Sequence, residues 1–105
     1  NDTKSVILVE GPADVWRLEE FGISNSLGLF GCKLSKQQFA LLNQLGVYNV
    51  YVALDNDEPG QIGSQNIINS LSSYFNTYQI SYPAKDVGEL TKSNINLFKA
   101  QIKES

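Results

Sequence analysis

The sequence predicts an α/β fold, a Rossmann-like sandwich of about four mostly parallel strands flanked by helices. Short apolar runs of strand length alternate with longer segments whose apolar residues recur at helical spacing. The run at 50–54 is apolar throughout, as expected of a strand buried on both faces of a parallel sheet. Most acidic residues follow directly after predicted strands, on the edge where such folds bind ligands.

The length of 105 residues suits one domain with one hydrophobic core. We expect a single domain over residues 1–105, with its core over about 5–91, excised from a larger protein. The hydrophobic content of 42% and charged content of 18% are typical of soluble globular proteins. No apolar run approaches the roughly 20 residues that cross a bilayer, so we expect no membrane association.

The composition excludes several kinds of site. The chain has one cysteine and no histidine, which excludes an internal disulfide, a zinc site and a histidine-based triad. A single cysteine also fits a reducing compartment, and we expect a cytoplasmic location. The net charge of −3 argues that this domain alone binds nucleic acid poorly, because nucleic-acid-binding faces are normally basic.

The first predicted unit is a strand over 5–9 followed by a helix over 13–21. The strand ends at Glu10, and Pro12 suits the first turn of the helix, which Gly22 ends. Asp14 falls in that first turn, where its charge would favour the helix dipole by about 0.3–1 kcal/mol. A role in support of the site is the alternative for Asp14.

The second predicted unit is a brief strand over 26–30, a loop at 31–33 and a helix. Ser35 is the expected N-cap and Gly46 the expected end of the helix. We expect Cys32 to be a small, partly buried residue without chemistry. The apolar side of the helix is formed by Phe39, Leu42 and Leu45.

The central strand, 50–54, runs directly into Asp55 and Asp57, and a Pro-Gly pair follows. A helix is expected over 61–75, then a strand over 78–82 and a terminal helix over 91–103, within a C-terminal segment of 92–105. The apolar faces of these two helices are predicted from Ile62, Ile67, Ile68, Leu71, Phe75, Ile95, Phe98 and Ile102.

The acidic residues are clustered in a way that solubility alone does not explain. In a parallel sheet all strand carboxyl ends share one edge, so residues that follow different strands should meet there. Carboxylates that close raise one another's pKa unless a cation lies between them, and their oxygens suit Mg²⁺ or Mn²⁺. A solvated turn with a helix N-cap is the structural alternative for the Asp-x-Asp. Seven of the eleven acidic residues follow predicted strands: Glu10, Asp14, Asp55, Asp57, Glu58, Asp86 and Glu89.

Three motifs in this order resemble the Toprim domain, the catalytic module shared by DnaG-type primases, topoisomerases and some nucleases. They are Glu10-Gly11-x-x-Asp14, Asp55-x-Asp57-x-x-Gly60 and Lys85-Asp86, each placed after a predicted strand. The segment 28–35 and the Lys85-Asp86 pair resemble the primase branch. The similarity spans about residues 5–91.

The resemblance implies specific roles. Glu10, Asp55 and Asp57 match the catalytic residues, and with Asp86 they match the ligands of Mg²⁺ or Mn²⁺. The family uses such ions for phosphoryl transfer. Asp14 and Glu58 would support these ligands, and Lys33 and Lys85 would contact nucleic acid or nucleotide. For Lys33, simple solvation is the alternative.

The function implied is that of a nucleotidyltransferase, the catalytic module of a DNA primase that makes RNA primers for DNA replication. The parent would be a bacterial or phage primase or primase–helicase. Its nucleic acid template, nucleoside triphosphates and other domains would be the partners, so the isolated fragment should be inactive. Pro12, Pro59 and Gln61 depart from residues common in the family pattern.

Four other functions remain open. A Toprim nuclease or topoisomerase module would use the same acids to cleave DNA. A non-catalytic Toprim interaction module would keep the acids for folding or assembly. A haloacid-dehalogenase-like phosphatase also uses Asp-x-Asp, but on the first strand. A two-component receiver domain also places acids and a lysine at strand ends, but its phosphorylated aspartate stands alone.

Overall fold

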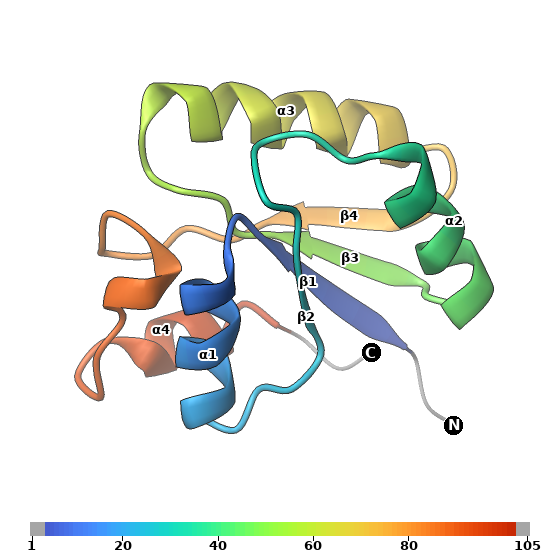
Figure 1. The fold of residues 1–105 in the computed structure, drawn as a ribbon. Coiled ribbons are helices and arrows are strands. Elements are labelled where there is room, and N and C mark those ends of the chain that lie inside the picture. Colours follow the sequence, from blue (N-terminus) through green and yellow to red (C-terminus); the bar gives the residue numbers. More distant parts are fainter. Residues whose placement is uncertain (1–3, 103–105) are drawn as a thin grey trace.

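The computed structural model describes residues 4–102, which form one four-stranded sheet in the order β2-β1-β3-β4. Each pairing of neighbouring strands is parallel, as the sequence predicts (Figure 1). The first strand therefore lies inside the sheet, between the second and the third. The strands are β1 (Ser5–Val9), β2 (Ser26–Gly28), β3 (Asn49–Val52) and β4 (Asn76–Gln79).

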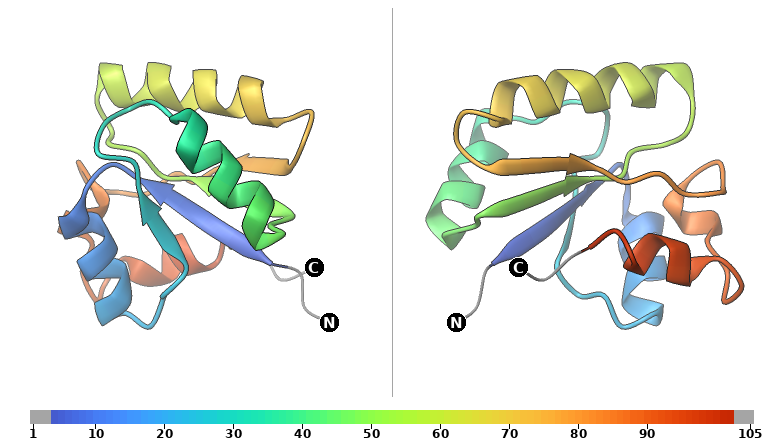
Figure 2. Two further views of the ribbon diagram at one scale, coloured as in Figure 1. Left: turned by 45° about the vertical axis from the view of Figure 1, so that its right-hand side comes forward. Right: turned by 180° about the vertical axis from the view of Figure 1, so that it is seen from behind.

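Helices cover both faces of the sheet (Figures 1 and 2). On one face lie α1 (Pro12–Glu20), the 3-10 turn η1 (Val87–Glu89) and α4 (Ile95–Lys99). The other face carries α2 (Lys36–Leu45) and α3 (Glu58–Leu71). No helix within residues 4–102 is long and apolar enough to cross a membrane.

Both central strands are buried on their two faces, which explains their unbroken apolar sequences. Side chains alternate along a strand, so one set of residues packs toward α1, η1 and α4 and the other toward α2 and α3. The first set includes Ile7, Val9 and Tyr51, with Phe98 among their helical partners. The second includes Val6, Leu8, Val50 and Val52, which share a core with Leu42, Ile67 and Leu71.

The ends of α1 and α2 follow the predicted signals. Pro12 occupies the first turn of α1, where its missing N–H costs no hydrogen bond. The Ser35 hydroxyl accepts the N–H of Gln38 at 3.1 Å and caps α2. Gly46, at φ 71°, ends that helix in the left-handed conformation. Leu45 is exposed, so the predicted apolar side of α2 is carried by Phe39 and Leu42.

The predicted bounds of α3 are wrong at both ends. The helix starts before Gln61 because the Asp57 side chain accepts the Gly60 N–H and so caps a turn that contains Pro59. It ends at Leu71, although Phe75 is still buried. Ile62, predicted on the apolar face, has 55% of its surface exposed.

The fourth strand lies earlier than the predicted 78–82. Its register is set by β3, because Asn49 is opposite Asn76 and Val52 is opposite Gln79. Beyond this pairing the chain stays extended, and Ile80 and Tyr82 are buried without being counted in the strand.

The predicted terminal helix is present, but its predicted bounds of 91–103 are too wide. The Asn94 side chain accepts the N–H of Thr91 at 2.7 Å, which fixes a turn ahead of α4. The helix then lasts five residues, from Ile95 to Lys99. Ile95 and Phe98 are buried as predicted, and Ile102 packs against them while half-buried. The end of the predicted helix, at residue 103, lies outside the described residues.

Candidate functional site

The carboxyl ends of β1 and β3 bring two of the predicted site residues together. The strands are adjacent, with Leu8 opposite Val52, so Glu10 and Asp55 each follow the same edge of the sheet. One carboxylate oxygen of Glu10, Oε2, accepts the backbone N–H of Asp55 at 2.9 Å. Glu10 therefore faces the loop that carries Asp55 and Asp57. We use the term acidic rim for Glu10, Asp14, Asp55, Asp57 and Asp86.

Asp55 is the electrostatic centre of the acidic rim. Partial burial, together with the negative charges of Glu10, Asp14, Asp86 and Asp57, raises the pKa of its carboxyl group to about 6. All four neighbours act on one carboxyl group, so the rim residues from three separate parts of the chain form one charge cluster. Within residues 4–102 no lysine or arginine forms an ion pair with a rim carboxylate. The rim carboxylates therefore have no direct ion-pair partner among these residues.

Asp57 also has the capping role that the structural alternative predicts. Its Oδ1 accepts the N–H of Gly60 at 2.8 Å and so caps α3. The turn is tight, because a Cβ on Gly60 would lie 2.2 Å from the backbone oxygen of Asp55. The glycine of the Asp55-x-Asp57-x-x-Gly60 motif is thus required by the close approach of helix and strand end.

Asp14 joins two segments that are far apart in the sequence. It is only 7% exposed, and its Oδ2 accepts the Gly11 N–H at 3.0 Å. Its Oδ1 accepts the Gly88 N–H at 2.8 Å. Arg17 adds a second link, because its Nε donates to the Gly88 oxygen at 2.9 Å. Asp14 thereby fixes the loop of Asp86 against the start of α1, a role more specific than the predicted interaction with the helix dipole.

Asn56 contributes to the site, although it occupies the unspecified position of the Asp55-x-Asp57 motif. Its side-chain amide donates to the backbone oxygens of Tyr82 at 2.9 Å and Ala84 at 2.6 Å. Its backbone N–H donates to the Lys85 oxygen at 2.7 Å. These bonds hold the segment that leads to Asp86 beside the loop after β3. No local sequence pattern marks this role, because the partners of Asn56 follow a different strand.

The thiol of Cys32 contacts the rim, which the sequence did not predict. Cys32 is half-buried as expected, and its side chain hydrogen-bonds to Glu10. Burial raises the pKa of the thiol, and the hydrogen bond to Glu10 and the charges of Glu10, Asp57 and Asp55 act in the same direction. The thiol therefore stays protonated and serves as a donor to the Glu10 carboxylate.

The remaining predicted site residues lie around the rim and are exposed. Lys33 directly follows Cys32, and Glu58 lies in the first turn of α3. Lys85 is held beside the loop after β3 through its backbone, since its oxygen accepts the Asn56 N–H. Lys85 thus lies on a loop that borders the rim, whereas Lys33 lines a hollow beside Asn66 and Ser70 of α3.

The carboxylate oxygens of the rim suit a hard divalent cation, but they do not converge on one point. Among residues 4–102 no three acidic or cysteine side chains converge as a metal-binding group. Glu10 and Asp57 each use one oxygen on a backbone N–H. Mg²⁺ or Mn²⁺ fits the rim by charge and by its oxygen donors, and each of these two carboxylates keeps a second oxygen that could ligate it.

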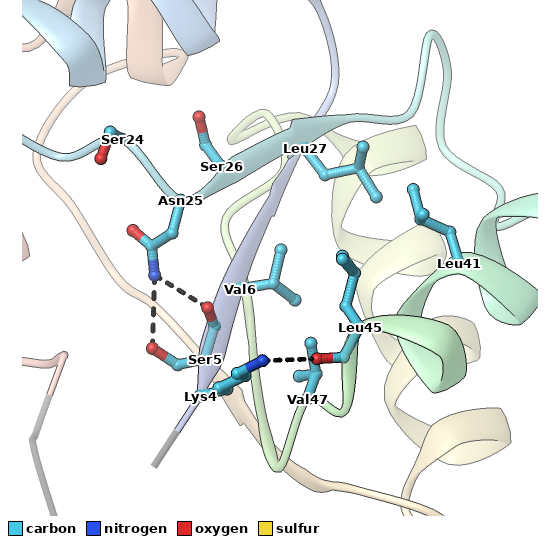
Figure 3. A pocket seen from close by; sticks show the side chains of 10 residues that line it. All are labelled: Lys4, Ser5, Val6, Ser24, Asn25, Ser26, Leu27, Leu41, Leu45 and Val47. Atoms are coloured by element: carbon cyan, nitrogen blue, oxygen red, sulfur yellow. Dashed lines mark hydrogen bonds between the residues drawn. The ribbon is translucent and has the colours of Figure 1, made fainter. Parts of the chain in front are cut away.

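A surface hollow of about 370 Å³ lies at the opposite end of the strands (Figure 3). Lys4 and Ser5, at the start of β1, line it, so it is separate from the acidic rim. Its walls are mainly apolar, with Val6, Leu27 and Leu45 among them. It brings no acidic residue together and supplies none of the predicted chemistry.

The sequence model of the family described as Toprim-like matches residues 7–91, most of the chain. The chain belongs to this Toprim-like family. The DnaG primase of Thermofilum pendens is 33% identical to it over 91 residues, which are 87% of this chain and 20% of that protein. The uncharacterized protein MG010 of Mycoplasma genitalium is 34% identical over 89 residues, 82% of this chain and 41% of that protein.

A solved structure supports the same assignment. The zinc-binding and RNA polymerase domains of the Aquifex aeolicus primase match this Toprim-like domain with a TM-score of 0.73 and 28% identity. The match covers 96% of this chain and 26% of that one. The Toprim-like domain therefore corresponds to a minor part of each of these longer relatives, and it is a domain of the DnaG type.

Proposed function

We propose that the acidic rim holds Mg²⁺ or Mn²⁺ and serves nucleotidyl transfer in the synthesis of RNA primers for DNA replication. The observation that carries this proposal is the hydrogen bond from the Asp55 N–H to the Glu10 carboxylate, at 2.9 Å, within a group of carboxylates that form no ion pair with a lysine or arginine of residues 4–102. The relatedness to DnaG primases favours primer synthesis over DNA cleavage by a nuclease or topoisomerase.

The proposed ligands are Glu10, Asp55, Asp57 and Asp86. A bound ion would lower the pKa of an attacking hydroxyl and offset the charge that develops on the phosphate. The Asp55 N–H and the Cys32 thiol orient the Glu10 carboxylate. Asp14 and Asn56 hold the loop of Asp86 in place.

The proposed partners are a nucleic acid template, nucleoside triphosphates and other domains of a primase or primase–helicase. Lys33 and Lys85 would contact the phosphates of these ligands. Lys85 lies on a loop that borders the rim, and Lys33 directly follows Cys32, whose thiol contacts the rim. Because the domain has a net charge of −3, we propose that other domains hold the nucleic acid. The isolated chain should then make no primers.

Calorimetric titration with Mn²⁺ tests the metal site. Asp57→Asn removes one negative charge but keeps an oxygen that can accept the Gly60 N–H, and we expect it to weaken Mn²⁺ binding about tenfold. Glu19→Gln is the matched control, because Glu19 is exposed on α1 and is not a rim residue. Equal affinity of the wild type and Asp57→Asn would reject the site.

A non-catalytic Toprim module is the second candidate. It is favoured by the backbone bonds that Asp14 and Asp57 make, since these bonds give both acids a structural use. In this case a longer protein that contains the domain would bind Mn²⁺ and yet show neither nucleotidyl transfer nor DNA cleavage. Primer synthesis that is lost in Glu10→Gln would decide for the catalytic function.

A further inference from the structure

Phe30 is an exposed aromatic residue at the edge of the acidic rim. It follows β2, and 79% of its surface is exposed. Its backbone N–H donates to the backbone oxygen of Glu10 at 2.7 Å, which places it beside a proposed metal ligand. The ring therefore lies at the edge of the sheet that carries the rim, but outside the core.

The backbone of Phe30 is strained. Among residues 4–102 it is the one non-glycine residue with positive φ, at 61°. A bulky side chain is disfavoured in this left-handed region, and such outliers gather at functional sites. Burial of the ring does not offset the strain here, because the ring remains exposed.

The loop around Phe30 is anchored on both sides. Before it, the Leu29 N–H donates to the Val9 oxygen at 2.8 Å. After it, the Cys32 side chain bonds to Glu10, and a Cβ on Gly63 would lie 2.6 Å from the Cys32 oxygen. The loop is therefore packed closely against α3, and Phe30 is presented on a fixed backbone.

We propose that Phe30 is a stacking platform for a nucleobase whose phosphate lies at the acidic rim. This inference rests on the proposed function, because the rim must bind phosphate through a divalent ion. A base offers a flat π-face to an aromatic ring, and single-stranded nucleic acids are bound by such rings combined with nearby cations. Lys33, further along the same loop, supplies the cation.

Binding of labelled oligo(dT) to the 105-residue chain tests the platform, measured by fluorescence anisotropy at low salt with Mg²⁺ and at high protein concentration, because the net charge of −3 makes binding weak. Absence of any binding by the wild type under these conditions would overturn the platform. Phe30→Ala should weaken binding about tenfold, and Phe30→Trp should retain it. An abasic oligomer of equal length should bind the wild type about tenfold more weakly than oligo(dT) does. Its affinity should be the same for the wild type and for Phe30→Ala. Tyr48→Ala is the matched control, since Tyr48 is 63% exposed at the opposite end of β3.

A parallel titration with UTP identifies the source of the base. Weaker UTP binding by Phe30→Ala would assign the platform to the incoming nucleotide, and weaker oligomer binding would assign it to a strand. If binding requires Mg²⁺ and Asp57 but is unchanged in Phe30→Ala, the platform is rejected while the proposed function stands. If oligomer binding is unchanged when Mg²⁺ is omitted and in Asp57→Asn, the proposed function itself is rejected.

Discussion

In the domain without a bound cation, burial and negative neighbours destabilise the charged form of Asp55. Its pKa is about 6 in the folded protein, against an ordinary value of 3.8, so the folded state binds a proton more tightly than the unfolded state. Stability is then lost as pH rises from about 4 to 6, and the loss persists above that range. Above about pH 6 the carboxyl group is ionised in the folded domain, and this charged form is disfavoured by its burial and its negative neighbours.

Asp55→Asn should therefore stabilise the metal-free domain at pH 7. After allowance for solvent screening of a partly buried carboxyl group, we expect about 1 kcal/mol, and almost no effect at about pH 4. Urea unfolding of both proteins across this pH range measures the difference. A stabilisation that is the same at both ends of the range would contradict the assignment to charge.

Glycine is required at position 60 because there is no space for a Cβ, not because the backbone needs its flexibility. Gly60→Ala would place a Cβ 2.2 Å from the Asp55 backbone oxygen, so we expect a loss of about 2 kcal/mol in the free energy of unfolding. Urea denaturation measures it. Asn66→Ala is the control on the same helix, because Asn66 is exposed, and it should leave stability nearly unchanged. Equal stability of the two variants would show that the turn can relax.

The meeting of the acidic residues could be predicted from the sequence, but the hydrogen bonds of the residues next to them could not. The positions of Glu10 and Asp55 followed from the rule that parallel strands end at one edge. The bonds of Asn56 and Cys32 depend on how loops from different strands meet, and no local pattern encodes that meeting.

At the scale of elements, Asp14 ties α1 to η1. Asp14→Ala would leave the N–H groups of Gly11 and Gly88 without their acceptor in a partly buried place. We expect a loss of about 2 kcal/mol in unfolding free energy, measured by thermal or urea unfolding. Asp14→Asn should lose less, since its one remaining oxygen can accept one of the two bonds. Wild-type stability of Asp14→Ala would show that these bonds contribute little.

Element boundaries were predictable where a local signal decides them. Ser35 and Gly46 set the ends of α2 through their own side chain and backbone preferences. The bounds of β4 are instead set by its pairing with β3, and the turn at Asn94 shortens the last helix. Periodicity of apolar residues carries no information about either the strand pairing or that turn, so it placed both elements wrongly.

At the scale of the molecule, cation binding should couple to folding. An ion that binds the folded rim relieves the mutual repulsion of its carboxylates, so millimolar Mg²⁺ should raise the melting temperature by several degrees, as about 1 kcal/mol of binding would. Scanning calorimetry with and without Mg²⁺ measures the shift. Asp57→Asn should show a smaller shift, and an unchanged melting temperature in the wild type would contradict a metal site.

The interior place of β1 has a consequence for biosynthesis. Of the four strands, β1 is translated first, and it needs residues 49–52 before its second edge is paired. Until then β1 exposes apolar side chains and unpaired backbone N–H and C=O groups, which favour aggregation. Productive folding of the sheet must therefore wait until β3 has been translated, and chaperone binding to β1 would protect the nascent chain during that interval.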